Sequence, residues 1–309
     1  MKNKFRPILC LILSVTLSVT FSACGMSAPS AQDSASASAS EEVPAEIDSI
    51  VVLAPSLAET VVALGLGEKI VGYDLQSEGI AGLPDGAPTF DTVNPDMESL
   101  AALSPDILLV TNLSLYDEED PYKPLTDAGV RVLCIPTSES ISGIQEDIRL
   151  LAESLHVPEA GESILEKMDA ELDKLASVAS GIPEEERKSV YFEISAAPYL
   201  YSCGSKTYLS EMIEWVGGKN IFSAETGWLN IEGEAVAAAN PDVIFTSVNY
   251  VDNPVDEILS RDGWAGVSAI QNRAVYAIDN MSSSLPNQNI ITAMRQMAEI
   301  LYPEAYGAA

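Results

Sequence analysis

The stretch that decides the fold is residues 159–180, which read EAGESILEKMDAELDKLASVAS. Five apolar residues repeat along it at i, i+4, i+8, i+11 and i+15, the spacing of one helix face: Ile164, Met168, Leu172, Leu175 and Ala179. Pro158 precedes the stretch and Gly181 follows it, as is typical of a helix start and stop. At about 1.5 Å per residue, the predicted helix is roughly 30 Å long, the width of a small domain.

Two similar segments flank this helix. Glu98 is followed by Ser104-Pro105-Asp106 and then by the apolar run 107–110, and Glu234 is followed by Asn240-Pro241-Asp242 and then by the apolar run 243–245. The same order and spacing on both sides predict two versions of one structural unit. We therefore expect an N-terminal lobe over residues 46–158, a connecting helix over 159–182 and a C-terminal lobe over 183–309.

Within both predicted lobes, short apolar runs alternate with helical segments. Ile50-Val51-Val52-Leu53 is typical of a buried parallel strand, and Ser56-Leu57-Ala58-Glu59 after it has the spacing of a helix capping box. Strands in alternation with helices predict an α/β fold with parallel sheets. Ser142 opens a second capping box, and His156 lies at the end of that helix, where we expect it to cap a carbonyl.

Composition excludes several classes of function. The 309 residues carry 46 acidic and 16 basic side chains, a formal charge of -30, which argues against nucleic acid or an anionic membrane surface as the main partner. His156 is the single histidine, so a transition-metal site or a Ser–His–Asp triad is not expected. Neither a Gly-x-Ser-x-Gly elbow nor a dinucleotide or Walker motif occurs. We predict that the protein is not an enzyme and holds no cofactor of its own.

The first residues predict export. Lys2, Lys4 and Arg6 precede an apolar segment that ends in small residues at Ser22-Ala23-Cys24, which is typical of a secretory signal. Phe21-Ser22-Ala23-Cys24 also resembles the bacterial lipobox, which implies a signal peptide over 1–23 and a lipid on Cys24; a plain signal peptide with an incidental cysteine is the alternative. Residues 24–45 are rich in Ser and Ala and predict a flexible linker. The expected location is extracytoplasmic, with the lipid as the only attachment to the membrane.

Two cysteines remain in the predicted folded part. Cys134 and Cys203 lie on opposite sides of the connecting helix, so a disulfide between them would join the lobes. Free cysteine is commonly a small core residue, and we expect two separate thiols.

The chain resembles the substrate-binding lipoproteins of ABC importers for cobalamin, haem and iron–siderophore complexes. The resemblance covers about residues 48–303 and is carried by Ala54-Pro55-Ser56, residues 63–67, the two Glu-to-Pro-Asp segments, residues 217–222 and Ser284-Leu285-Pro286. It implies a class III binding protein, in which two Rossmann-like lobes are joined by a single long helix and the ligand lies between them. It also implies an ABC permease dimer with its ATPase as partner, and we expect a monomer.

The resemblance also implies roles for single residues. Glu98 and Glu234 match positions at which the family grips arginines of the permease; the alternative is that each acid only complements a helix dipole, for about 0.3–1 kcal/mol. Ligand-binding candidates are the loop residues Ser56, Tyr73, Tyr116, Tyr199, Tyr201, Trp228 and Tyr250. Aromatic faces with polar edges suit a large macrocycle, although each aromatic could instead be a core residue.

The ligand class follows from the charges near the expected cleft. Leu285 stands where relatives frequently have Arg, and only Arg261 and Arg273 lie close by in sequence. An acidic protein with few cleft cations disfavours a polyanionic ligand. We therefore expect a corrinoid, with a haem or a ferric siderophore as alternatives and a non-transporting adhesin or structural lipoprotein as the rival of another class.

Overall fold

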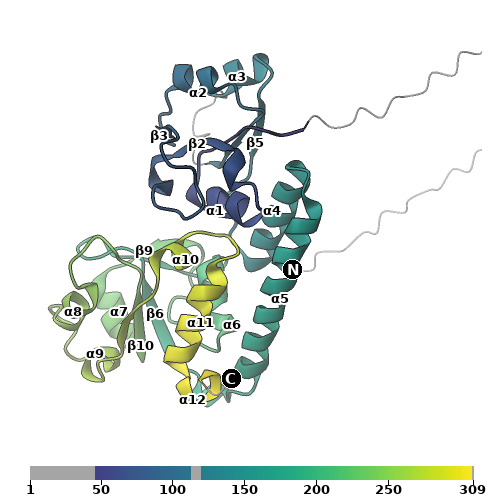
Figure 1. The fold of residues 1–309 in the computed structure, drawn as a ribbon. Helices are drawn as coiled ribbons and strands as arrows, with labels where there is room; N and C mark the ends of the chain where they lie inside the picture. Colours follow the sequence, from purple (N-terminus) through teal and green to yellow (C-terminus); the bar gives the residue numbers. More distant parts are fainter. Residues whose placement is uncertain (1–45, 113–119, 308–309) are drawn as a thin grey trace, which may run out of the picture. The chain divides into compact units, whose positions relative to one another are not determined.

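The first half of the chain builds a five-stranded parallel sheet (Figure 1). The computed structural model describes residues 46–112 and 120–307, which belong to one structural unit that begins at Glu46. The strand order is β3-β2-β1-β4-β5, with every neighbouring pair parallel. The strands are β1 (Ile50–Val52), β2 (Ile70–Asp74), β3 (Thr89–Phe90), β4 (Ile107–Val110) and β5 (Arg131–Cys134).

Helices cover both faces of this sheet, because alternate residues of β1 point to opposite sides. Ile50 and Val52 pack in one apolar cluster with residues of α1 and α4. Val51 and Leu53 pack in another cluster with residues of α2 and α3. The helices are α1 (Pro55–Ala63), α2 (Met97–Leu103), α3 (Lys123–Asp127) and α4 (Ile141–Ser154).

The second half of the chain builds a four-stranded parallel sheet in the order β11-β10-β6-β8. Its strands are β6 (Ser189–Glu193), β8 (Lys219–Asn220), β10 (Val243–Thr246) and β11 (Val275–Ala277). A separate antiparallel pair, β7 (Tyr201–Cys203) with β9 (Trp228–Asn230), forms in the region that the sequence predicts as loop. The sequence does not predict these two strands, because the polar residues Ser202 and Asn230 interrupt their apolar residues.

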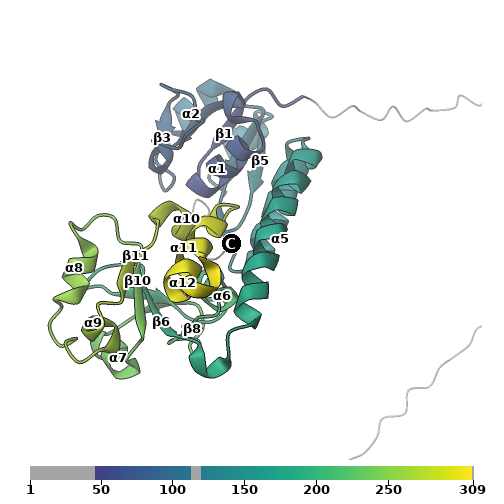
Figure 2. The same cartoon turned by 60° about the horizontal axis from the view of Figure 1, so that its bottom comes forward.

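The second sheet is also covered on both faces. Val190 and Phe192 of β6 pack with α6, α11 and α5, whereas Tyr191 between them packs with α7, α8 and α9. The helices are α6 (Tyr208–Trp215), α7 (Gly233–Ala239), α8 (Pro254–Leu259), α9 (Ser268–Gln271), α10 (Asn280–Ser284), α11 (Ile290–Leu301) and α12 (Pro303–Tyr306). Figure 2 shows α11 beside α6 and α5, and it packs against both of them.

The helix that the first sequence pattern predicts is α5 (Pro158–Ser180), which follows the first sheet and precedes the second. Its residues Met168, Leu172, Leu175 and Ala179 are buried as expected, Ile164 is half-buried, and Leu165 is buried as well. Near its start α5 packs closely on α4 at Gly161, where an added Cβ would lie 2.5 Å from the Cβ of Ala152. The α/β fold with two parallel sheets and one long intervening helix is confirmed.

The two similar sequence segments form equivalent structures. Asp106 precedes β4 and its Oδ2 accepts hydrogen bonds from the backbone N and Oγ of Ser49, at 2.9 and 2.8 Å. Asp242 precedes β10 and its Oδ2 accepts from the same two groups of Ser189, at 2.8 and 2.7 Å. In each half the aspartate therefore fixes the start of the neighbouring central strand.

Two predicted helix starts differ in the structure, whereas the predicted position of His156 at a helix end is confirmed. Pro55 occupies the first turn of α1, so Ala54 is the N-cap and the Ser56 capping prediction is wrong. The N-cap of α4 is Ser140, whose Oγ accepts from the backbone N of Gly143 at 3.0 Å, so Ser142 is not the cap. His156 follows Leu155, the C-cap of α4, and its backbone has a φ of 61° and donates its N–H to the carbonyl of Glu153.

Two further expectations concern the thiols and the membrane. Cys134 and Cys203 are free cysteines, which confirms two separate thiols. Across the described residues, no helix combines the length and the apolar character needed to cross a membrane. The predicted signal peptide, Cys24 and the linker lie outside the described residues.

Candidate functional site

Three aromatic rings line a pocket of about 300 Å³, which we call the larger pocket. Tyr201 and Trp228 come from the adjacent strands β7 and β9, and Tyr208 begins α6. The rings of Tyr208 and Trp228 meet edge to face, with centroids 5.5 Å apart. The remaining lining residues are neutral: Thr137, Ile194, Leu209, Ser247, Ser283, Ser284 and Pro286. Thr137 follows β5 of the first sheet, so both halves of the chain contribute to this pocket.

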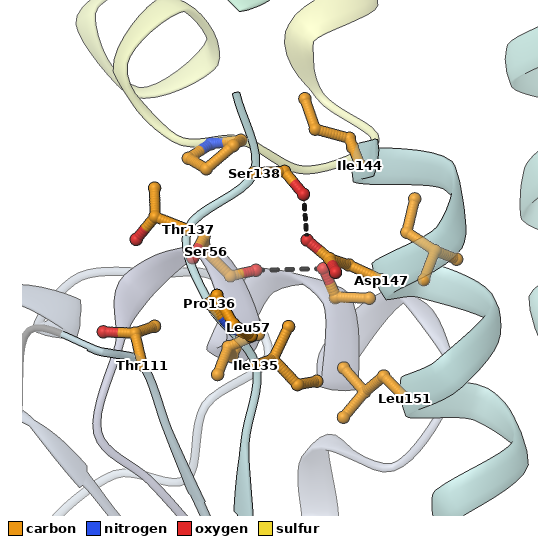
Figure 3. A pocket seen from close by; sticks show the side chains of 13 residues that line it. Ser56, Leu57, Thr111, Ile135, Pro136, Thr137, Ser138, Ile144, Asp147 and Leu151 are labelled. Carbon is orange, nitrogen blue, oxygen red and sulfur yellow. Dashed lines mark hydrogen bonds between the residues drawn. The ribbon is translucent and has the colours of Figure 1, made fainter. Parts of the chain in front are cut away.

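A smaller pocket of about 20 Å³ adjoins the larger one, and Thr137 and Pro286 line both (Figure 3). Ser56 and Thr60 of α1 lie on one side of it, and Thr60 Oγ1 donates to the carbonyl of Ser56 at 2.9 Å. Asp147 of α4 lies on another side, where its Oδ2 accepts from Ser138 Oγ at 2.5 Å. The other lining residues are Leu57, Thr111, Ile135, Pro136, Ile144, Ile148 and Leu151.

The structure brings three of the predicted ligand residues to these pockets. Ser56 lines the smaller pocket, and Tyr201 and Trp228 line the larger one. Tyr73 is buried in the core beside the first sheet and lines neither pocket. Tyr116 lies outside the described residues.

Two predicted ligand residues are exposed on loops that follow β6 and β10. Tyr199 is 82% exposed and Tyr250 is 66% exposed. The hydroxyl of Tyr250 accepts from the backbone N of Ala196 at 2.9 Å and lies 3.0 Å from Ser195 Oγ. This bond joins the two loops but places neither tyrosine in the two pockets described.

Sequence reasoning missed several residues of the site. Tyr208 follows Thr207, the N-cap of α6, and nothing in its spacing distinguishes it from a core residue. Asp147 had a usable signal, because it lies among Ile144, Ile148 and Leu151 on the apolar face of α4. A carboxylate on an apolar helix face is unusual unless it has a partner or a function.

The two pockets carry almost no charge. Neither is lined by Lys, Arg or His, and Asp147 is the one acidic residue among their lining residues. Burial raises the pKa of the Asp147 carboxyl, the hydrogen bond from Ser138 lowers it, and the charge of Glu146 raises it further, with a net upward shift. The site therefore presents aromatic rings, hydroxyls and one carboxyl group.

Arg261, which the sequence places near the cleft, is fully engaged elsewhere. It donates to both carboxylate oxygens of buried Glu193, at 2.6 and 3.0 Å, and also pairs with Glu257. Its guanidinium lies 4.4 Å from the ring centroid of Trp264. These contacts leave it holding β6 to α8 rather than facing a ligand. Arg273 is exposed on the surface.

Carboxylates also bridge the two halves of the chain. Glu59 of α1 accepts at Oε2 from the side-chain amides of Asn287 and Asn289, at 2.6 and 2.9 Å. Glu211 of α6 accepts from the backbone N of Ile141, the first residue of α4, at 2.8 Å. The Glu59 bonds lie beside the smaller pocket, since Ser56, Thr60 and Pro286 are sequence neighbours of the residues that make them. In the described part of the chain, no cluster of three or more His, Cys, Asp or Glu suits a metal ion.

Glu98 and Glu234 occupy equivalent positions. Each is the second residue of its helix, α2 or α7, and each is exposed. Each helix ends at a residue in the left-handed conformation, Ser104 with a φ of 45° and Asn240 with a φ of 49°. The two carboxylates are therefore repeated surface features of the two halves.

Comparison with known proteins agrees with this architecture. A family model described as periplasmic binding protein matches residues 50–281. A relative from Bacillus subtilis (strain 168), the "Uncharacterized ABC transporter substrate-binding lipoprotein YvrC", is 29% identical over 270 residues that cover 85% of this chain and 83% of the relative. A vitamin B12-binding protein of Vibrio campbellii is 24% identical over 260 residues, covering 81% of this chain and 88% of the relative.

A solved structure shows the same fold. The molybdate-binding protein MolA of Haemophilus influenzae, bound to molybdate, matches with a TM-score of 0.73 and 22% identity over 85% of this chain and 89% of that chain. The Bacillus subtilis relative is named as a substrate-binding protein of an ABC transporter, and the Vibrio campbellii relative and the family model are named as binding proteins, which confirms the prediction that the chain is not an enzyme. The family model covers most of the folded part, and the chain belongs to the periplasmic binding protein family.

Proposed function

We propose that this protein is the extracytoplasmic binding component of an ABC importer and captures a corrinoid. The observation that carries the ligand class is the larger pocket, where Tyr201, Tyr208 and Trp228 meet neutral hydroxyls without any cationic side chain. Aromatic rings and a few polar groups suit a large ligand with flat apolar surfaces. A vitamin B12-binding relative of similar length supports the same class.

The absence of cationic side chains from the pocket linings favours a corrinoid over a haem or a ferric siderophore. Haem and many ferric siderophores carry carboxylates or other anionic groups, which bind best to Arg or Lys. The sequence suggested Arg261 and Arg273 near the cleft, but Arg261 is paired with Glu193 and Glu257, and neither arginine lines the two pockets. A haem or ferric siderophore therefore remains the alternative ligand, with less support from the lining residues.

Docking to the permease is assigned to Glu98 and Glu234. Their equivalent helix positions, their exposure and their shared spacing from Asp106 and Asp242 support two matching contacts on a two-fold symmetric partner. Carboxylates pair with arginine through strong, often bidentate hydrogen bonds, so two of them would fix the orientation of the complex.

Attachment to the membrane is assigned to a lipid on Cys24. The sequence around Cys24 supports this assignment, and the Bacillus subtilis relative is named as a lipoprotein. The protein would then work as a tethered monomer outside the cell membrane, where it meets both its ligand and the permease.

Thermal unfolding with a ligand panel tests the proposed function. Cyanocobalamin, cobinamide, haem and several ferric siderophores are each added to the purified protein, and the melting temperature is followed. A ligand at about 100 times its dissociation constant stabilises the folded state by about 2.7 kcal/mol, a clearly visible shift. Stabilisation by the corrinoids supports the proposal. Stabilisation by haem or a siderophore alone keeps the transport role and overturns the ligand, and no stabilisation favours the adhesin class.

A further inference from the structure

Asp147 is a carboxyl group beside the apolar face of α4, and one of its two oxygens makes no hydrogen bond to the described residues. Ile144 and Ile148 flank it and are buried, and Asp147 itself is half-buried. Its Oδ2 accepts from Ser138 Oγ at 2.5 Å, whereas its Oδ1 has no hydrogen-bond partner among the described residues. No Lys, Arg or His forms an ion pair with it there, and the neighbouring charge is Glu146, another acid. Partial burial disfavours the ionised form of this carboxyl group, and a further donor at Oδ1 would favour that form.

Asp147 lines a space of limited size. The smaller pocket measures about 20 Å³, which is enough for one water molecule or one small polar group. Figure 3 shows Asp147 reaching toward Ser138 across from Ser56 and Leu57 of α1. Thr111 also lines this pocket, and its buried Oγ1 makes no hydrogen bond within the described part of the chain. The pocket therefore holds two polar groups with unused hydrogen-bonding capacity.

The smaller pocket is positioned to receive part of a larger ligand. Thr137 and Pro286 line both pockets, so a molecule in the larger pocket lies within reach of the smaller one. The Glu59 bonds to Asn287 and Asn289 hold α1 to the segment after Pro286, which keeps these walls together. Since an ionised carboxylate only accepts hydrogen bonds, the group that fits beside Oδ1 must donate one.

We propose that the smaller pocket is a specificity subsite for an N–H donor, a primary carboxamide of the ligand, which donates to Oδ1 of Asp147. The inference deepens the proposed function and rests on it for the presence of a ligand in the larger pocket. A carboxamide matches the uncharged larger pocket, and a ligand carboxylate at the same place would be repelled by Asp147. The subsite thus selects amide-bearing ligands against acid-bearing ones.

A small-molecule titration tests the subsite without any assumption about the natural ligand. The full folded protein, labelled with ¹³C at Asp carboxyl groups, is titrated with acetamide and separately with acetate at neutral pH. We expect acetamide to shift the Asp147 resonance saturably and acetate to leave it unchanged. Asp147→Asn identifies the resonance by its loss. No response to acetamide, as would follow if the pocket holds only a fixed water, overturns the subsite even if the importer role is correct.

A second measurement uses a whole ligand. Cyanocobalamin, which carries primary carboxamides, is titrated into the wild type, Asp147→Ala and the control Glu153→Gln, an exposed acid on the same helix. A hydrogen bond to a charged group predicts that Asp147→Ala weakens binding about 10- to 100-fold, while Glu153→Gln stays within about twofold of the wild type. Equal affinity of Asp147→Ala and the wild type overturns the inference. If cyanocobalamin does not bind the wild type, the corrinoid proposal fails and the acetamide result alone decides the subsite.

Discussion

At the scale of the residue, the half-buried Asp147 carries a cost in stability. Burial raises the pKa of its carboxyl above the ordinary 3.8, so the folded state holds this proton more tightly than the unfolded chain does. As pH rises through 3.8 toward the higher folded pKa, the unfolded chain loses its proton first, and the free energy of unfolding falls. Above the folded pKa the loss is complete and constant. Ionised Asp147 therefore destabilises the fold at neutral pH.

We predict that Asp147→Asn raises the melting temperature at pH 7 and that this gain shrinks as the pH falls toward 4. The amide oxygen of the new side chain still accepts from Ser138, so the known hydrogen bond is kept. Calorimetry of the mutant and the wild type between about pH 4 and 8 measures the difference. Glu153→Gln, with the same change of charge at an exposed site of α4, serves as the control and is expected to give a small, flat difference. A gain that does not depend on pH would contradict the assignment.

At the scale of the element, the close contact of α4 and α5 depends on Gly161. We predict that Gly161→Ala destabilises the protein by about 1–3 kcal/mol, because the new methyl group meets Ala152 at 2.5 Å and must force the helices apart. This loss exceeds the gain of roughly 1 kcal/mol that alanine gives over glycine inside a helix. Denaturant unfolding of the mutant beside Ser163→Ala, an exposed change on the same helix, measures it.

A double-mutant cycle shows whether the contact itself is responsible. Ala152→Gly removes the methyl group that Gly161→Ala would meet, so the two changes together should cost less than their separate effects added. Strict additivity would mean that the cost of Gly161→Ala arises elsewhere than at this helix contact.

At the scale of the whole molecule, the two halves are expected to act together on the permease. We predict that Glu98→Ala with Glu234→Ala leaves ligand affinity unchanged and abolishes uptake, because both residues are exposed and neither lines the two described pockets. Each charge-assisted hydrogen bond contributes about 1.5–3 kcal/mol, so losing two weakens docking about 100-fold or more. Uptake of labelled cobalamin by cells and binding by the purified protein are measured in parallel.

A matched control changes two other exposed acids. Glu68→Ala with Glu304→Ala removes the same charge from different parts of the surface and should leave both uptake and binding near the wild-type level. Normal transport by the Glu98 and Glu234 double mutant would contradict the docking assignment, since helix-dipole stabilisation would then be sufficient to explain both acids.

The local sequence determined the fold of this protein. Helical spacing from Ile164 to Ala179 predicted α5, and the repeated Pro-Asp segments predicted the equivalent starts of β4 and β10. Such features depend on periodicity and turn chemistry within a few residues, which a single sequence displays directly. The sequence predicted helix caps less reliably than helices. Proline favours the first turn of a helix, so α1 begins at Pro55, before the position that the Ser56 capping box predicts.

Only the tertiary structure decided the site. Tyr73 and Trp228 are both aromatic residues of strands, and no local sequence feature distinguishes them. Tyr73 nevertheless packs in the core, whereas Trp228 lines the larger pocket. Thr137 and Pro286 belong to different halves of the chain, yet they line the same two pockets, and Asp147 lines the smaller of these. Whether a side chain lies in the core or lines a pocket depends on which distant residues pack around it, and that packing is a property of the folded chain as a whole.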